Sequence, residues 1–351
     1  MTSYSSTNIR RQTPRRPATL AVRAIRLWFA LESRLAPQSA ERRAARMFVT
    51  PPRHKRANRS YLQLVPDDLL DVTNVAVREP GVQVSATTIG HGPTVMLLHG
   101  WGGSVVDMMP AATALACAGY RAVLFDMPGH GRSPGRHSSL VEFLRAMGAV
   151  SRTLGAPELL VGHSFGGAAA VFGITELGLP ARGAVLFSPA PGPAYYVDRF
   201  ARTVGLPRER TNGMMRLVVE RVGRSVESLD ALAAARSARV PAVIFHDPAD
   251  REVPFEFAQQ MSSTWAGSRL VARAALGHKR ILRDASTISA AVDFAREVVP
   301  VDGPGRWPSG DQPNDQGHRF DFRPAPAARC SHATARCLSR LAPLARDSFT
   351  A

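Results

Sequence analysis

Short apolar runs alternate with helix-like stretches between residues 94 and 300. The runs are only four or five residues long and predominantly apolar, which is typical of parallel strands that are buried on both faces. The predicted strands are residues 94–98, 122–125, 158–161, 183–187, 241–245 and 268–272. Ser139 and Glu142 form a predicted capping box for a helix that begins at Leu140, and Gly155 predicts its end. The alternation predicts an α/β fold with a mostly parallel central sheet flanked by helices.

Two segments depart from this alternation. Residues 82–89 predict a half-exposed strand, paired antiparallel with the segment around residues 75–78. About fifty residues separate the strands at 183–187 and 241–245, where a single crossover helix would need fewer. In helix-like stretches this interval carries large apolar side chains: Tyr195, Tyr196, Phe200, Met214, Met215 and Leu217. We expect a small helical cap over about residues 190–238, above the carboxyl edge of the sheet.

The positive charge of the chain is concentrated near its N-terminus. The formal net charge is +16, and residues 1–60 carry 14 Lys or Arg against 2 acids, whereas residues 61–300 carry 23 against 21. This distribution predicts a basic N-terminal arm over residues 1–60 and an α/β domain over residues 61–300. A tail rich in Pro, Gly and Arg follows over residues 301–351, and we expect it to be disordered. No nucleic-acid partner is expected for the folded body.

Within the arm, an amphipathic helix is predicted at about residues 18–48. Arg23, Arg26 and Glu32 interrupt its apolar run, which is unlike a signal peptide. We expect its apolar side to pack on the body, and contact with an anionic membrane surface is the alternative. The sequence contains no run of 18 apolar residues that would form a membrane-spanning helix, so we expect a cytoplasmic protein. If the helix contacts a membrane surface, the protein would be peripheral to that membrane. The apolar side consists of Val22, Ile25, Trp28 and Phe29.

The cysteines give no sign of a metal site. Cys117 lies in an apolar stretch and is expected to be a buried thiol. Cys330 and Cys337 flank His332, but their spacing matches no usual zinc pattern. The sequence also has neither a phosphate-binding P-loop nor a dinucleotide-binding glycine motif after its first strand. We therefore expect no metal and no cofactor.

The pentapeptide at residues 162–166, Gly-His-Ser-Phe-Gly, carries the clearest chemical signal. It directly follows the predicted strand at 158–161 and precedes a stretch of small residues that predicts a helix. A serine between strand and helix occupies a strained turn, next to which only glycines fit, and its hydroxyl points above the sheet. Ser164 is therefore a candidate nucleophile.

The turns that follow the other predicted strands carry further sequence motifs. The chain resembles the α/β-hydrolase fold superfamily over roughly residues 70–300. The matching motifs occur in the expected order: H-G-W-G-G at 99–103, D-M-P-G-H-G-R-S at 126–133, the nucleophile elbow G-H-S-F-G-G at 162–167, H-D-P-A-D-R-E-V-P at 246–254, and G-H at 277–278.

This resemblance implies a Ser-His-Asp triad. Ser164 is the nucleophile, His278 the general base and Asp250 the acid, with Asp247 and Glu252 as alternatives for the acid. His278 also follows by elimination, because the other histidines after the acid loop, His318 and His332, lie in the predicted tail. The backbone N–H groups of Trp101 and Phe165 are the implied oxyanion hole. His99, Asp126 and His130 are expected to organise the loops, and the expected substrate pocket comprises Trp101, His163, Tyr195 and Met214.

These residues predict a cofactor-independent serine hydrolase that cleaves a carboxylic ester or thioester through an acyl-enzyme. C–C or amide hydrolysis and acyl transfer use the same machinery and remain alternatives, as does a noncatalytic binding protein on this fold. No acidic residue occupies position 164, so dehalogenase and epoxide-hydrolase chemistry are not expected. The expected partner is a small-molecule acyl substrate, and the oligomeric state is left open.

Overall fold

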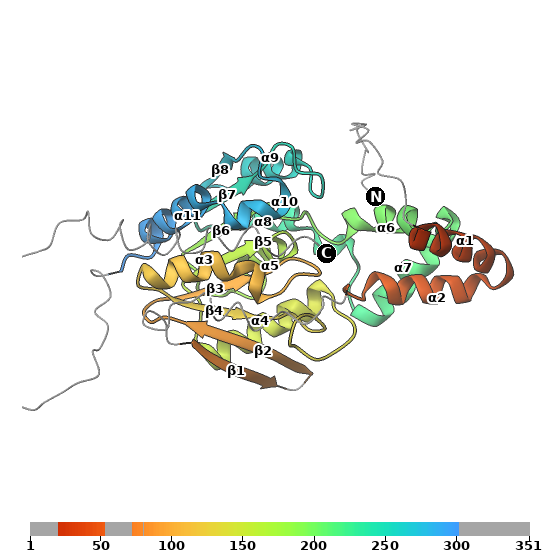
Figure 1. The fold of residues 1–351 in the computed structure, drawn as a ribbon, viewed down its shortest axis with the longest axis horizontal. Coiled ribbons are helices and arrows are strands. Elements are labelled where there is room, and N and C mark those ends of the chain that lie inside the picture. Colours follow the sequence, from red (N-terminus) through yellow and green to blue (C-terminus); the bar gives the residue numbers. More distant parts are fainter. Residues whose placement is uncertain (1–19, 53–71, 80, 302–351) are drawn as a thin grey trace, which may run out of the picture.

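The computed structural model describes residues 20–52, 72–79 and 81–301. An eight-stranded sheet forms the centre of the molecule, in the order β1-β2-β4-β3-β5-β6-β7-β8 (Figure 1). Strands β1 and β2 are antiparallel to each other, β2 is antiparallel to β4, and all remaining pairs are parallel. The bounds are β1 Val72–Glu79, β2 Val82–Ile89, β3 Thr94–Leu98, β4 Arg121–Phe125, β5 Leu159–His163, β6 Gly183–Phe187, β7 Ala242–His246 and β8 Ser268–Ala272.

The predicted α/β fold with a mostly parallel sheet is therefore confirmed. Every predicted strand is present, and the observed bounds differ from the predicted ones by no more than two residues at either end. The antiparallel pairing of residues 82–89 with the segment around 75–78 is also confirmed. Ser139 caps the predicted helix α4, because its hydroxyl accepts a hydrogen bond from the N–H of Glu142 at 3.2 Å.

Helices cover both faces of the sheet. Helices α3 (Val105–Cys117) and α11 (Ala285–Val298) share one apolar core with side chains from one face of the strands. A second core joins the opposite face to helices α4 (Leu140–Leu154), α5 (Phe165–Thr175), α8 (Ala231–Ala235) and α9 (Phe255–Thr264). Adjacent strand residues alternate between these cores: Val95 and Leu97 enter the first, Met96 and Leu98 the second. The carboxyl ends of the parallel strands are left accessible to loops.

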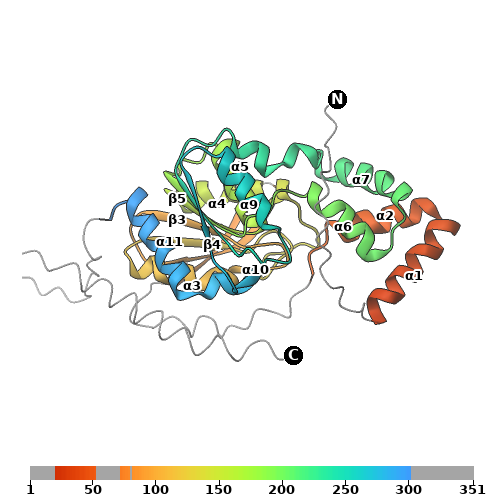
Figure 2. The same cartoon turned by 90° about the horizontal axis from the view of Figure 1, so that it is seen from above.

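A separate group of helices lies beyond one end of the sheet (Figure 2). It consists of α1 (Leu20–Leu35), α2 (Pro37–Phe48), α6 (Ala194–Val204) and α7 (Arg208–Val222), which we call the outer helices. They enclose an apolar core of their own that includes Phe29, Ala44 and Met214. The outer helices thus combine two segments that are about 150 residues apart in the sequence.

The interval between β6 and β7 is helical, as the sequence predicts, but it is divided between two parts of the molecule. Helices α6 and α7 belong to the outer helices, whereas η2 (Glu227–Leu229) leads back to α8, which contacts α5 and α9. The described part of the N-terminal arm also differs from its prediction, because it forms two helices and not one. The break falls at Ala36, directly before Pro37, whose ring prevents a helix from continuing through it.

The side chains of α1 are also distributed differently from the prediction. Phe29 is buried and Val22 is half-buried, but Ile25 and Trp28 are exposed. Cys117, expected to be buried, is half-buried near the end of α3. The predicted tail at 301–351, including Cys330 and Cys337, lies outside the described residues except for its first residue, and so do residues 1–19 and 53–71.

Candidate active site

Ser164 occupies a sharp turn between β5 and α5. Its backbone dihedrals, φ 51° and ψ −116°, fall in a region that non-glycine residues rarely adopt, and its N–H donates to the carbonyl of Phe187 at 2.9 Å. The flanking glycines are required by space, because a Cβ at Gly162 would collide with the main chain of Gly166, and one at Gly166 with the carbonyl of Leu98. The strand-turn-helix geometry predicted for residues 162–166 is therefore present.

A buried carboxylate holds the imidazole of His278. The Nδ1 atom of His278, in helix α10 (Gly277–Arg280), lies 2.7 Å from Oδ2 of Asp250, whose side chain is fully buried. The other oxygen of Asp250 accepts the N–H groups of Glu252 at 2.8 Å and Val253 at 3.1 Å. Burial raises the pKa of Asp250, but these hydrogen bonds and the partner imidazole outweigh it and leave the pKa below its usual value. Asp250 is thus ionised and accepts the Nδ1 proton of His278.

The two alternative acids, Asp247 and Glu252, do not contact Nδ1 of His278. Asp247 accepts the N–H of Ala249 at 2.8 Å and the N–H of Gly277, so its carboxylate ties the acid loop to the loop that carries His278. Glu252 lies on the opposite side of the imidazole, with Oε2 3.8 Å from Nε2 of His278, and its side chain is 53% exposed. Of the three carboxylates, Asp250 has the geometry of an orienting acid.

His246 is a further neighbour of this pair. Its Nε2 lies 3.0 Å from the carbonyl oxygen of Val253 and 3.5 Å from Oδ2 of Asp250. Burial lowers the pKa of His246, so the ring is neutral and its Nε2–H donates into the acid loop. Sequence reasoning gave His246 no role, although its place as first residue of the acid-loop motif was a usable signal.

The proposed oxyanion donors come from two turns, the one that carries the serine and the one after β3. Phe165 is the first residue of α5, so its N–H has no acceptor within the helix. In the part of the chain that the structure describes, no hydrogen bond is made by the N–H of Phe165 or of Trp101. Trp101 lies on the turn after β3, and the rings of Trp101 and Phe165 meet edge to face with centroids 5.5 Å apart. Both N–H groups are therefore available for an incoming oxygen.

Two neutral histidines shape the turn that carries Trp101. Nε2 of His130 accepts the N–H of Gly102 at 3.1 Å, and Nε2 of His99 accepts the N–H of Met127 at 3.0 Å. On each ring Nδ1 then carries the proton and faces a carbonyl oxygen, at 2.8 Å for His99 and 3.1 Å for His130. Asp126 joins the same loops by accepting the N–H groups of Val105 and Arg132. These contacts fit the loop-organising roles predicted from the sequence.

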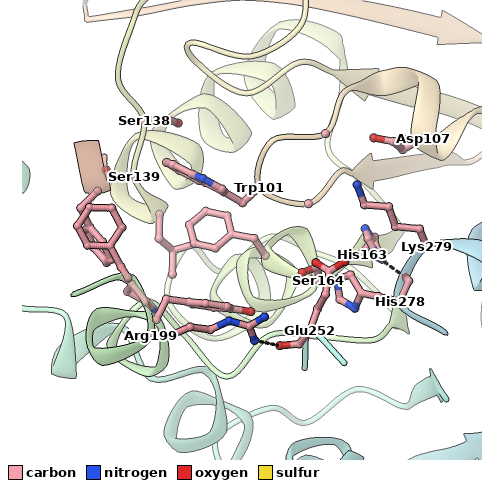
Figure 3. A pocket seen from close by; sticks show the side chains of 18 of the residues that line it. Trp101, Asp107, Ser138, Ser139, His163, Ser164, Arg199, Glu252, His278 and Lys279 are labelled. Carbon is pink, nitrogen blue, oxygen red and sulfur yellow. Dashed lines mark hydrogen bonds and ion pairs between the residues drawn. The ribbon is translucent and has the colours of Figure 1, made fainter. Parts of the chain in front are cut away.

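Ser164 and His278 open into one cavity of about 860 Å³ (Figure 3). Among the described residues no hydrogen bond joins their side chains, and in such sites this contact often tightens only with substrate bound. Lys279, Arg280 and Glu252 also border the cavity. The lining of the cavity is mainly apolar: Trp101 and Phe165 belong to the turns beside the serine, and Phe48, Val49, Phe200, Val218, Val222 and Leu229 come from other segments.

Two of the four predicted pocket residues do not line the cavity. Trp101 and His163 do, but Tyr195 faces Phe257, with ring centroids 5.0 Å apart, and Met214 is fully buried among the outer helices. The residues of α6 that face the cavity recur every three or four positions, and Tyr195 lies at the edge of this face, about 100° from Tyr196 and about 40° from Arg199. Met214 is one turn before Val218 on α7, where α2 covers it. The α6 residues that do line the cavity are Tyr196, Arg199, Phe200 and Thr203.

The N-terminal helices contribute a wall that sequence reasoning missed. Phe48 and Val49, at the end of α2, border the cavity, and the ring of Phe48 meets that of Phe200 edge to face at 5.3 Å. The only sequence signal for this contact was the amphipathic pattern of the arm. That pattern indicated a buried side but not the surface that covers it.

Comparisons with known proteins agree with the described fold. The family model of the alpha/beta hydrolase fold matches residues 93–173. A curated protein named epoxide hydrolase, from Caballeronia sordidicola, is 35% identical over 91 residues, which cover 24% of this chain and 28% of that protein. The esterase Pf2001 of Pyrococcus furiosus superposes with a TM-score of 0.54 at 22% identity, over 71% of this chain and 99% of that one.

A second solved structure is similar to the same extent. Est1E from Butyrivibrio proteoclasticus, solved with ferulic acid bound, gives a TM-score of 0.53 at 19% identity and covers 64% of this chain and 99% of that one. At such low identity the solved structures establish the fold alone. Together with the family match across the elbow, they show that this chain has the α/β-hydrolase fold.

Proposed function

We propose that this protein is a serine hydrolase that cleaves carboxylic esters or thioesters without a cofactor. The observation that carries the proposal is the shared cavity: Ser164, on its strained turn, and His278, held by the buried Asp250, line the same space. A serine hydroxyl is unreactive at neutral pH unless a base removes its proton. The arrangement supports that activation.

In the proposed reaction, Oγ of Ser164 attacks the acyl carbon while Nε2 of His278 takes the hydroxyl proton. The N–H groups of Trp101 and Phe165 hold the oxyanion, and Asp250 stabilises the imidazolium. The bond to the leaving oxygen or sulfur then breaks as His278 returns the proton to it. Water attacks the acyl-serine in the same way, which releases the carboxylic acid and restores the hydroxyl of Ser164.

The cavity favours a substrate with an apolar acyl part. Its volume of about 860 Å³ falls within the range of small-molecule sites, and its lining as a whole is mainly apolar. Apolar walls stabilise a bound chain by about 0.8 kcal/mol for each buried methylene group. We infer that esters with medium or long acyl chains bind better than acetate esters.

The name of the matched relative raises epoxide opening as a second reaction, but residue 164 disfavours it. A carboxylate that opens an epoxide forms an ester, which water can hydrolyse. A serine hydroxyl would form an ether, which is stable to hydrolysis at such a site. The segment matched by the family model includes the elbow, and the central residue of the elbow in this chain is Ser164.

Labelling by a fluorophosphonate tests the activated serine. We expect the wild-type protein to be labelled covalently and Ser164→Ala to remain unlabelled, with circular dichroism verifying that both are folded. A panel of p-nitrophenyl esters and acyl thioesters of increasing chain length then measures kcat/KM. A folded wild type that resists the probe would contradict the proposal and support a noncatalytic binding protein. Labelling without turnover of any ester or thioester would point to C–C or amide cleavage, or to acyl transfer.

A further inference from the structure

Helix α1 presents a concentration of exposed apolar side chains. Among the described residues seven large hydrophobic side chains are exposed, and only Leu177 lies outside this helix. Single exposed apolar residues are ordinary, whereas a contiguous patch indicates an interaction surface. The six in α1 are Leu20, Ile25, Leu27, Trp28, Leu31 and Leu35.

Most of these side chains fall on one stripe. Leu20, Leu27, Leu31 and Leu35 are separated by seven, four and four residues, which places them on one side of an α-helix. Phe29 lies roughly opposite and is buried in the core of the outer helices. Helix α1 therefore has two apolar faces, one packed and one without a partner among the described residues. We call the second the leucine stripe.

The packed face fixes the orientation of α1. The guanidinium of Arg26 donates to the carbonyl oxygens of Thr203 at 3.1 Å and Arg202 at 3.3 Å, at the end of α6. Cations at a helix C-terminus are stabilised by its dipole. Helix α1 lies at the end of the molecule remote from the sheet (Figure 2). Because this contact and Phe29 hold it against α2 and α6, the leucine stripe on its other face remains exposed.

The charge around the leucine stripe is positive. Arg23 and Arg34 lie along one edge of it by helical geometry, and both are exposed. The two acids of α1 and α2 are both paired with arginines: Glu32 with Arg43 at 2.8 Å, and Glu41 with Arg210 at 3.6 Å. A basic margin beside an apolar stripe complements a surface that is anionic outside and apolar within.

We propose that α1 docks this protein on an anionic lipid bilayer, lying in the plane of the interface with the leucine stripe among the acyl chains. Helices of this kind combine Leu and Trp on one side with Arg on the other, and they lie on the membrane without crossing it. In the described part of the chain no helix is long and apolar enough to cross one. The docked helix would hold α6, and with it a wall of the cavity, close to the lipid surface.

Vesicle co-sedimentation of the full-length protein tests this proposal. We expect binding to vesicles of phosphatidylcholine mixed with phosphatidylglycerol at low salt, weaker binding at high salt, and little binding to phosphatidylcholine alone. Leu27→Asp/Leu31→Asp should weaken binding at least about 100-fold, because two apolar side chains are lost from the interface. Leu177→Asp, the matched control on the body, should bind like the wild type. Thermal unfolding verifies that all three proteins are folded.

Trp28 supplies a direct readout, because it is exposed at the edge of the leucine stripe. Vesicles should shift its fluorescence to shorter wavelength, and Trp28→Phe should lose most of that shift while still co-sedimenting. Equal weakening by Leu177→Asp, or no binding to anionic vesicles at low salt, would overturn the proposal. So would light scattering that finds a dimer in the wild type and a monomer in Leu27→Asp/Leu31→Asp, because a second copy would then cover the stripe.

Discussion

The imidazole Nε2 of His163 lies 2.9 Å from the backbone carbonyl oxygen of His278. Burial lowers the pKa of His163 to about 3, so the ring is neutral near pH 7 and its Nε2–H donates to that carbonyl. The two rings are also in contact, with centroids 4.7 Å apart. The residue before the proposed nucleophile thus fixes the main chain of the proposed base, although the two are 115 positions apart.

His163 is accordingly a positioning residue, and its replacement should affect turnover more than binding. We expect His163→Ala to lower kcat about 100-fold with KM little changed, because a small displacement of a base costs a factor of that order. His163→Gln, whose amide can donate to the same carbonyl, should recover part of the loss. Steady-state kinetics on one ester measures both. A purely structural role would lower activity equally in both variants, in step with their stability.

The same histidine predicts acid sensitivity of the fold. Its folded-state pKa of about 3 lies below the usual value near 6.5, so below pH 6.5 the unfolded chain binds a proton that the native protein excludes. The stabilisation is complete above pH 6.5 and is lost as the pH falls toward 3. Between pH 6.5 and 4.5 the loss is about 2–3 kcal/mol.

Urea unfolding at a series of pH values measures this loss. His163→Gln has no titrating ring, so its free energy of unfolding should fall less steeply than that of the wild type over the same interval. Parallel pH dependences for the two proteins would show that His163 does not titrate as described. The buried His246 contributes to the acid sensitivity of both proteins equally.

The two aspartates of the acid loop should respond differently to the same change. Asp250→Asn removes the charge that orients His278 and should lower kcat about 1,000- to 10,000-fold. Asp247→Asn disturbs the contact with the N–H of Gly277 and should lower the free energy of unfolding by about 1–3 kcal/mol, with a much smaller loss of kcat. Kinetics and urea unfolding of both variants separate the two effects. If Asp247→Asn were the more damaging to kcat, the assignment of the acid would be wrong.

Two substitutions on different faces of α1 form a matched pair for a test of stability. Phe29 is 1% exposed and Leu27 is 73% exposed, although they are two residues apart. Phe29→Ala should destabilise the outer helices by about 3–5 kcal/mol because it leaves a cavity in their core. Leu27→Ala should change their stability by less than about 0.5 kcal/mol. Native-state hydrogen exchange of α6 and α7 measures both, and equal effects would contradict the described packing of α1.

The sheet was predictable because its signal is local. Each strand is a short apolar run that ends in a recognisable turn, and parallel strands bring those turns together at one edge of the sheet. The same reasoning made Ser164, Asp250 and His278 candidates, since each follows the end of a strand. The choice of Asp250 over Asp247 depended on resemblance, because both follow β7 and only the fold reveals which carboxylate reaches the imidazole.

The cavity walls were less predictable because they depend on contacts between distant segments. Nothing in the periodicity of residues 18–48 indicated that Phe48 meets Phe200, or that Met214 is covered by α2. On α6, Tyr195 and Tyr196 are equally apolar in sequence, and the rotation of the helix alone decides which one lines the cavity. An amphipathic pattern shows that a helix has a buried face. Which surface covers that face depends on the tertiary structure.

The wall formed by Phe48 and Val49 has a consequence for how the chain can vary. The groups proposed to break the bond all follow strands of the sheet, whereas part of the cavity wall is built by a helix that precedes the sheet in sequence. Under the proposed function, part of the selectivity is therefore encoded in a stretch of the chain that is separate from the reacting groups. Exchange of residues 37–49 for those of another such protein should give a hybrid with the same chemistry and a different preference among acyl groups.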